Sequence, residues 1–141
     1  MSADHVAKSS MSDREYANEN GTMQTFLPGT QYVLGNRLDL PLKECEERDL
    51  AFSMASDYNP NCPSLSIPFV GSLAVHRMGL DPLTALVSVT RNPGTTLSQN
   101  IEKHNGTIEI GRSSSILVLP SENVESWVSS FGTMNNLHMI N

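Results

Sequence analysis

The sequence predicts an α/β protein built on a parallel sheet. Strand, helix, strand, helix and strand patterns follow one another within about fifty residues, and this alternation is typical of βαβ units. The apolar run at 50–55 indicates a strand that is buried on both faces. That run leads into Asp57 and a loop crowded with turn residues. A carboxylate delivered by a buried strand into a rigid loop is the usual layout of a binding or catalytic site.

Helix caps and turn residues divide the first half of the chain into short elements. Ser12 and Glu15 form a capping-box pattern, in which the serine accepts an early backbone N–H and the glutamate reaches back. Pro28 and Gly29 are expected to end a strand. In chain order we expect an opening segment that begins inside an element at 1–10, a helix at 13–20, a strand at 22–27, a loop at 28–41, a helix at 42–49 and a strand at 50–55.

The second half is expected to be helical before a short β element. One helix shows apolar residues at helical spacing, and a second begins with Asp81 as N-cap and Pro82 in its first turn. The expected boundaries are Ser64 or Ser66 and Gly79 for the first helix, Asp81 and the pair Pro93 and Gly94 for the second, a polar stretch to Asn105, β segments at 106–112 and 116–119, and a tail at 127–140 made of a helix and a last strand.

Length and charge narrow the class of protein. The 141 residues are one domain's length, and the net charge is −6 with nine Lys and Arg residues that do not cluster. Neither nucleic acid nor an anionic membrane is therefore an expected partner. Cys45 and Cys62 form no Cys-x-x-Cys pattern, and no apolar run approaches the roughly 20 residues of a membrane span. With no signal-peptide pattern either, we expect reduced thiols and a cytoplasmic location.

Asp57 is the first candidate site residue, although an aspartate in this position is also a common N-cap or turn former. Asn59 and Pro60 stiffen its loop, and the asparagine offers a donor and an acceptor to a polar ligand. His5 ends a different short segment, and a parallel arrangement would place it on the same face as Asp57. The two could bind or support a divalent metal or its bound water, but zinc normally takes at least three protein ligands.

Cys62 lies near Asp57, which raises the possibility of a nucleophile. No histidine stands in a diagnostic relation to it, so an inert loop thiol is favoured. The glycine-rich patterns that bind nucleotide phosphates are absent from the sequence.

Several blocks of the sequence, in the right order, resemble the C-terminal third of the imidazolonepropionases, a family of the amidohydrolase superfamily. The resemblance covers nearly the whole chain. The blocks are Ala3-Asp4-His5, Thr-Phe-Leu-Pro-Gly at 25–29, Ala-Ser-Asp-Tyr-Asn-Pro at 55–60, Met-Gly-Leu-Asp-Pro-Leu-Thr-Ala-Leu at 78–86 and Gly-Thr-Ile-Glu-Ile-Gly-Arg at 106–112.

The resemblance implies the last βα units of a (β/α)₈ TIM barrel followed by a short C-terminal β element. Residues 1–105 would be the C-terminal part of a metal-dependent hydrolase barrel, and residues 106–141 its return into a small β-domain. The family's other metal ligands lie in parts that this chain does not match. We therefore expect the chain alone to be inactive.

The resemblance also implies roles for site residues. Asp57 matches a metal ligand, for zinc or iron, that handles the proton of the attacking water. His5 matches the histidine that polarises the substrate carbonyl. Asn59 matches a residue that holds the substrate's carboxylate side through its loop. Asn61 and Cys62 stand where the family has a glycine and a hydroxyl residue near that carboxylate, and they are the other two expected substrate-binding residues. The reaction implied is opening of the ring of 4-imidazolone-5-propanoate to N-formimidoyl-L-glutamate, in histidine degradation.

The expected partners are the small-molecule substrate and either a homo-oligomer or a partner copy that covers the open edges of a partial barrel. Two alternatives stay open. The chain could act in another amidohydrolase, such as a deaminase or a dihydroorotase-like enzyme. It could also be a non-catalytic α/β binding or assembly module.

Overall fold

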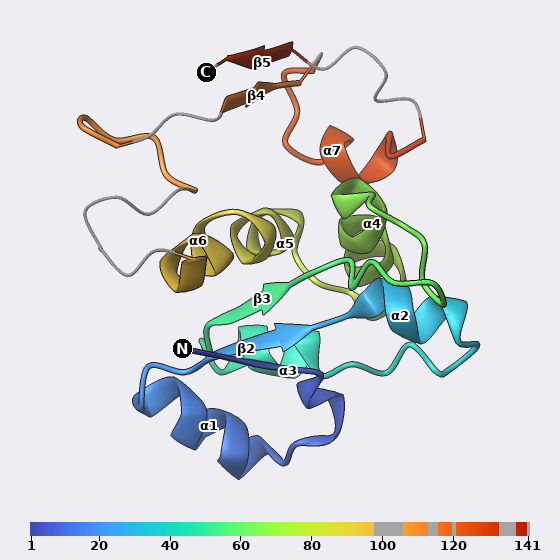
Figure 1. Ribbon diagram of the computed structural model, residues 1–141, viewed down its shortest axis with the longest axis vertical. Coiled ribbons are helices and arrows are strands. Elements are labelled where there is room, and N and C mark those ends of the chain that lie inside the picture. The colour runs from blue at the N-terminus through green and yellow to red at the C-terminus, as the bar shows by residue number, and fades with distance from the viewer. Residues whose placement is uncertain (98–105, 113–115, 120, 133–137, 141) are drawn as a thin grey trace.

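A three-stranded parallel sheet organises the N-terminal part of the chain (Figure 1). The computed structural model describes residues 1–97, 106–112, 116–119, 121–132 and 138–140. The strands are β1 (Ser2–Asp4), β2 (Met23–Phe26) and β3 (Phe52–Met54), in that spatial order. Because neighbouring strands run parallel, their carboxyl ends lie along one edge of the sheet. The predicted α/β class with a parallel sheet is confirmed.

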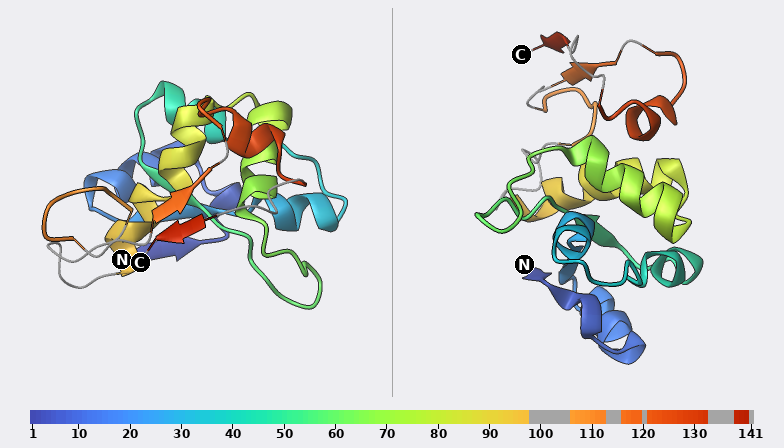
Figure 2. Two further views of the ribbon diagram at one scale, coloured as in Figure 1. Left: turned by 90° about the horizontal axis from the view of Figure 1, so that it is seen from above. Right: turned by 90° about the vertical axis from the view of Figure 1, so that its right-hand side faces the viewer.

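Helices cover the sheet in layers, as Figure 2 shows. Helix α1 packs on β2 from one side, and α5 and α6 pack on β3 from the other. The helices of this part are the 3-10 helix η1 (Val6–Lys8), α1 (Met11–Glu19), α2 (Pro28–Val33), α3 (Leu42–Glu47), α4 (Ile67–Met78), α5 (Pro82–Val89) and α6 (Arg91–Leu97).

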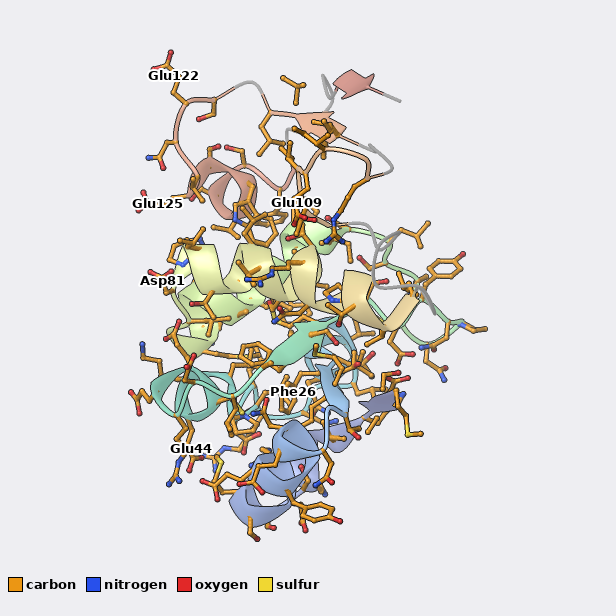
Figure 3. The ribbon with its side chains drawn as sticks, turned by 90° about the vertical axis from the view of Figure 1, so that its left-hand side faces the viewer. Phe26, Glu44, Asp81, Glu109, Glu122 and Glu125 are labelled. Atoms are coloured by element: carbon orange, nitrogen blue, oxygen red, sulfur yellow. The ribbon has the colours of Figure 1, made fainter. Side chains whose placement is uncertain are left out.

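The core lies between the sheet and the α4 to α6 layer. Phe26 of β2 and Phe52 of β3 meet edge to face, with ring centroids 5.7 Å apart, and both are almost fully buried. Figure 3 shows Phe26 in the middle of the molecule. Aromatic pairs of this kind add about 1 kcal/mol to the gain from burial. This core holds the sheet, and with it the strand ends, in a fixed position.

Apolar side chains attach the C-terminal segment to the rest of the fold, among them the buried Val128 and Phe131, whose ring centroid lies 5.6 Å from that of Phe69. Helix α7 (Ser126–Ser129) carries Trp127, whose ring lies over Gly71 of α4. A Cβ at Gly71 would lie 2.2 Å from the tryptophan ring, so only glycine leaves room for this contact. Strands β4 (Ile116–Val118) and β5 (His138–Ile140) pair antiparallel. The predicted strand at 116–119, tail helix and last strand are confirmed, whereas the predicted domain division at 105 stays a prediction.

Two predictions for the first forty residues are wrong, one about the start of a helix and one about a loop. Ser10 rather than Ser12 caps α1, because Ser10 has the extended backbone of an N-cap and exchanges hydrogen bonds with Asp13. The predicted loop at 28–41 also contains α2. Pro28 occupies the first turn of α2, where its missing N–H costs nothing, instead of only ending the strand.

Two further predictions fail in the second half. Pro93 and Gly94 lie inside α6, because α5 already ends at Val89 and a proline is tolerated in the first turn of the next helix. The predicted β segment at 106–112 is a turn. Gly106 and Gly111 have φ values of 97° and 86°, which are incompatible with a regular strand. The predicted polar stretch ending at Asn105 lies outside the described residues from 98 onward.

Within the described ranges, no helix combines the length and the apolar character needed to cross a membrane.

Candidate functional site

Three polar side chains meet at the carboxyl ends of the three parallel strands. His5 follows β1, Thr30 lies in the first turn of α2 after β2, and Asp57 follows β3. The Thr30 hydroxyl donates a 2.8 Å hydrogen bond to Oδ2 of Asp57. Nε2 of His5 lies 3.9 Å from the same oxygen, too far for a direct hydrogen bond but close enough for an ion pair when the imidazole is protonated. The predicted convergence of His5 and Asp57 is what the structure shows.

Both predicted catalytic residues have a left-handed backbone. Asp57 has a φ of 52° and His5 a φ of 59°. Non-glycine residues adopt this region rarely, and each such residue costs roughly 1–3 kcal/mol, which is typical of functional sites. Aspartate tolerates it better than most residues because its short side chain can hydrogen-bond locally. The left-handed backbone at these two positions therefore costs folding free energy, and it sets the directions in which the two side chains project.

Exposure separates the two groups. The Asp57 side chain is 25% exposed, whereas that of His5 is 65% exposed. The carboxylate is therefore the more sheltered of the two groups, and the imidazole is largely open to solvent. An exposed imidazole in this position can donate a hydrogen bond to a polar group that approaches the carboxylate.

Thr30 is a site residue that sequence reasoning missed. Its side chain is only 9% exposed, and its contact with Asp57 joins residues 27 positions apart. The sequence did carry one signal for Thr30, which is its position. Thr30 is the first residue after the predicted strand end at Pro28 and Gly29 whose side chain can form a hydrogen bond. Reading 28–41 as a loop hid the first turn of α2 and its position beside β3.

The loop after Asp57 is organised by Asn59. Its amide nitrogen donates a 2.6 Å bond to the Asp57 carbonyl, and its side-chain oxygen accepts the backbone N–H groups of Asn61 and Cys62 at 2.9 and 3.2 Å. Backbone bonds between Asn59 and Cys62 close the turn. Asn59 is therefore occupied inside its own loop.

The other two predicted substrate-binding residues face in different directions. Asn61 is exposed at the tip of the loop. Cys62 is fully buried beneath it, and its thiol lies 3.6 Å from the Ser56 carbonyl, with Gly29 close by. Cys45 and Cys62 are both free thiols. Cys62 therefore anchors the loop, and its sulfur is not presented to solvent.

The described residues do not complete a metal site. They bring together one carboxylate, Asp57, and one imidazole, His5, and nowhere in the described ranges do three His, Cys, Asp or Glu side chains gather. A structural or catalytic zinc takes at least three protein ligands. Any metal at Asp57 therefore needs ligands from outside this part of the chain.

A hollow of about 370 Å³ lies elsewhere, between the start of α5 and the segment before α7. Its acidic side chains point outward on one side of the molecule, as Figure 3 shows for Asp81, Glu122 and Glu125. The Asp81 carboxylate caps α5, because Oδ1 accepts the N–H groups of Leu83 and Thr84 at 2.8 and 3.2 Å. This hollow contains neither His5 nor Asp57.

Next to this hollow, Glu46 of α3 accepts the Asp81 backbone N–H at 3.1 Å and the Lys43 ammonium at 2.6 Å. Burial by itself would raise the pKa of Glu46. The hydrogen bonds from Lys43, Thr84 and the Asp81 backbone outweigh that effect, so the pKa of Glu46 lies below its ordinary value. These contacts join α3 to the start of α5.

The comparison with solved structures defines the class of fold. The crystal structure of guanine deaminase from C. acetobutylicum, with guanine bound in the active site, matches 98% of this chain and 37% of that chain with a TM-score of 0.71. The sequence identity is 15%, so this similarity concerns the fold. The chain thus has the α/β architecture found in part of this guanine deaminase.

The sequence comparison is more specific. Imidazolonepropionases from Syntrophobacter fumaroxidans, Symbiobacterium thermophilum and Thermoanaerobacter pseudethanolicus are 34%, 31% and 30% identical to this chain over 84%, 84% and 94% of its length. The resemblance to imidazolonepropionases that the sequence blocks indicated is confirmed. The chain spans only 27–31% of the length of these relatives. No family model matches the chain.

Proposed function

We propose that this chain is part of an imidazolonepropionase-like hydrolase that opens the ring of 4-imidazolone-5-propanoate to N-formimidoyl-L-glutamate. The convergence of His5 and Asp57 at parallel strand ends carries the proposal, in a chain with 30–34% identity to imidazolonepropionases. Within it, residues 1–105 form the last βα units of a (β/α)₈ barrel and residues 106–141 return into a small β-domain. Its place would be the cytoplasm, which suits the free Cys45 and Cys62.

Asp57 and His5 have different catalytic roles in this proposal. Asp57 would supply one ligand of a divalent metal, zinc or iron, and the other ligands would have to come from outside the described residues. When bound, such a metal activates water at neutral pH. The Asp57 carboxylate accepts the proton released by the attacking water. The exposed imidazole of His5, next to the Asp57 carboxylate, donates a hydrogen bond to the substrate carbonyl.

The loop at 59–62 acts on the substrate's carboxylate side. Because Asn59 is engaged by its own loop, its contribution is to shape the turn rather than to contact the substrate with a free amide. Asn61 is exposed at the tip of the turn and, in this proposal, contacts the substrate's propanoate. Cys62 contributes by fixing the turn from below.

The two edges of the sheet differ in what covers them. On the outer edge of β3, the side chain of Asn92 in α6 donates a 2.7 Å bond to the Phe52 carbonyl. On the other side, β1 pairs only with β2 among the described residues. An unpaired strand edge attracts another strand. For the chain by itself, without the rest of the barrel, we propose that a partner copy covers β1. Sedimentation of the isolated chain as a dimer or larger oligomer supports this, whereas a monomer contradicts it.

A hybrid enzyme tests the proposed reaction. In the Symbiobacterium thermophilum imidazolonepropionase, the segment that matches over 120 residues is replaced by the corresponding part of this chain. We expect the hybrid to open 4-imidazolone-5-propanoate, and the relative with that segment deleted, or this chain by itself, to show no turnover. A folded, metal-loaded hybrid without turnover contradicts the proposal.

The same hybrid discriminates between the alternatives. Turnover of guanine or of a dihydropyrimidine ring in place of the imidazolone would favour another amidohydrolase. An unreactive hybrid whose stability and subunit composition are unchanged would favour a binding or assembly module.

A further inference from the structure

Two residues donate hydrogen bonds to different parts of Asp57, and the family resemblance assigns neither of them a role in positioning it. Thr30 binds its carboxylate, and Asn59 binds its backbone carbonyl. We infer that Thr30 is a positioning residue for Asp57, with Asn59 fixing the backbone from which the carboxylate projects. The catalytic meaning of this inference rests on the proposed function.

The Thr30 contact has the features of a fixed support. Thr30 sits in the first turn of α2, immediately after β2, so the central strand of the sheet sets its position. Its side chain is 9% exposed, and its hydroxyl reaches across to the end of β3 to donate the 2.8 Å bond to Oδ2. A buried hydroxyl that loses its partner carries a desolvation penalty, so the pair is favoured together.

The Asn59 contact fixes the backbone. The left-handed φ of 52° at Asp57 turns the chain sharply after β3, and the Asn59 amide donates to the carbonyl that this turn presents. The same side chain accepts two backbone N–H groups farther along the loop. The buried Cys62 then pins the end of the turn under Ser56.

The geometry leaves a defined part of the carboxylate for chemistry. Thr30 occupies one acceptor position of Oδ2, whereas Oδ1 accepts no hydrogen bond from the described residues. The His5 imidazole lies on the open side. A carboxylate that is locked in one rotamer presents the same oxygen to a ligand in every turnover, which is the benefit of a preorganised site.

The inference is tested on the chain itself by nuclear magnetic resonance. Three-bond couplings to Cγ of Asp57 report whether its χ1 angle is single or averaged. Thr30→Val removes the hydroxyl at nearly constant shape, and Thr30→Ser keeps it. Thr25→Val is the matched control, because Thr25 is equally buried in β2 but its hydroxyl pairs with Ser53 at 2.9 Å.

We expect a single Asp57 rotamer in the unmodified chain, in Thr30→Ser and in Thr25→Val, and averaged couplings in Thr30→Val. A single rotamer in folded Thr30→Val overturns the inference. If that variant does not fold, Thr30→Ala replaces it, and the same two outcomes decide.

The hybrid enzyme then separates the two proposals. Loss of turnover by at least about tenfold at unchanged KM in Thr30→Val, with Thr30→Ser restoring it, is the expected catalytic counterpart. A hybrid that is inactive before any substitution, combined with the rotamer result as expected, would count against the proposed function alone. An active hybrid in which Asp57 stays in one rotamer without the hydroxyl would count against the positioning role alone.

Discussion

Asp57 and Asp81 each follow an element of the fold, β3 and α4, and precede a helix, yet their backbones and carboxylates differ in conformation and in bonding. Asp81 has an ordinary extended backbone with a φ of −64°, and its carboxylate accepts two N–H groups from the next three residues. Asp57 has a strained φ of 52°, and its carboxylate is bound by a threonine 27 positions away in sequence. The first is satisfied locally and stabilises a helix, whereas the second is held in place by tertiary structure.

The two regions also show that the hollow and the candidate reactive side chains lie in different places. Among the carboxylates that line the hollow beside Asp81, that of Asp81 caps α5 and that of Glu125 accepts a hydrogen bond from the Asn123 side chain. The described residues that line this hollow include no imidazole or thiol. The strand ends at Asp57 join a strained carboxylate, a strained imidazole and a buried hydroxyl. A left-handed backbone alone does not single out Asp57, because Asp49 has a φ of 55° as well. The combination of that backbone with a hydrogen bond from a distant residue and a nearby imidazole distinguishes Asp57 from Asp81 and makes it the candidate site carboxylate.

The largest effect that separates the two aspartates is expected in catalysis. In the hybrid enzyme, Asp57→Asn keeps an acceptor for Thr30 but removes the proposed base, so turnover should fall by at least about 100-fold. Asp81→Asn should leave turnover unchanged, because an asparagine also caps a helix. Steady-state kinetics on both variants measures this. Equal activity of the two variants would break the comparison.

The parts of the fold that sequence could predict are those controlled by local contacts. Asp81 with Pro82, and Ser66 with Gly79, mark helix ends through bonds and backbone angles that involve only a few neighbours. Pro28 misled the prediction because a proline both stops strands and starts helices, and only packing of α2 against α4 decides between them.

The candidate site shows the same limit. The meeting of His5 with Asp57 was predictable, because parallel strands bring their carboxyl ends to one edge. The Thr30 contact was not, since it depends on how α2 begins relative to the end of β3. The left-handed backbone of Asp57 was also hidden, because no local pattern distinguishes it from the ordinary backbone of Asp81.

The second effect concerns stability at Asp81. Asp81→Ala removes the acceptor for the N–H groups of Leu83 and Thr84 and should lower the free energy of unfolding of the chain by about 1 kcal/mol. Asp81→Ser retains a capping oxygen and should stay within a few tenths of the unmodified chain. Urea denaturation at pH 7 measures both. An alanine variant as stable as the serine variant would show that the cap contributes nothing.

The third effect isolates strain at Asp57. Asp57→Gly and Asp57→Ala both remove the carboxylate and its bond from Thr30, so their difference reports the backbone alone. Glycine should be more stable than alanine by about 1 kcal/mol, because it adopts a φ of 52° without a steric penalty. At Asp4, the last residue of β1, the order should reverse, since glycine weakens a strand. If alanine is the more stable variant at position 57 as well, the backbone there is not strained.

The smallest effect is a pH dependence on the Asp81 side of the molecule. Because the pKa of Glu46 is lowered on folding, the unfolded chain binds its proton at higher pH than the folded chain does. The resulting stabilisation is fully present above the unfolded value near 4.5 and is lost as the pH falls through the lower, folded value. Glu46→Gln should therefore narrow the stability difference between pH 6 and pH 3 by less than about 1 kcal/mol, whereas Glu47→Gln on the exposed face of α3 should leave it unchanged. Urea midpoints across that pH range measure the effect, and a parallel pH dependence in both variants would show that Glu46 does not couple α3 to the Asp81 cap.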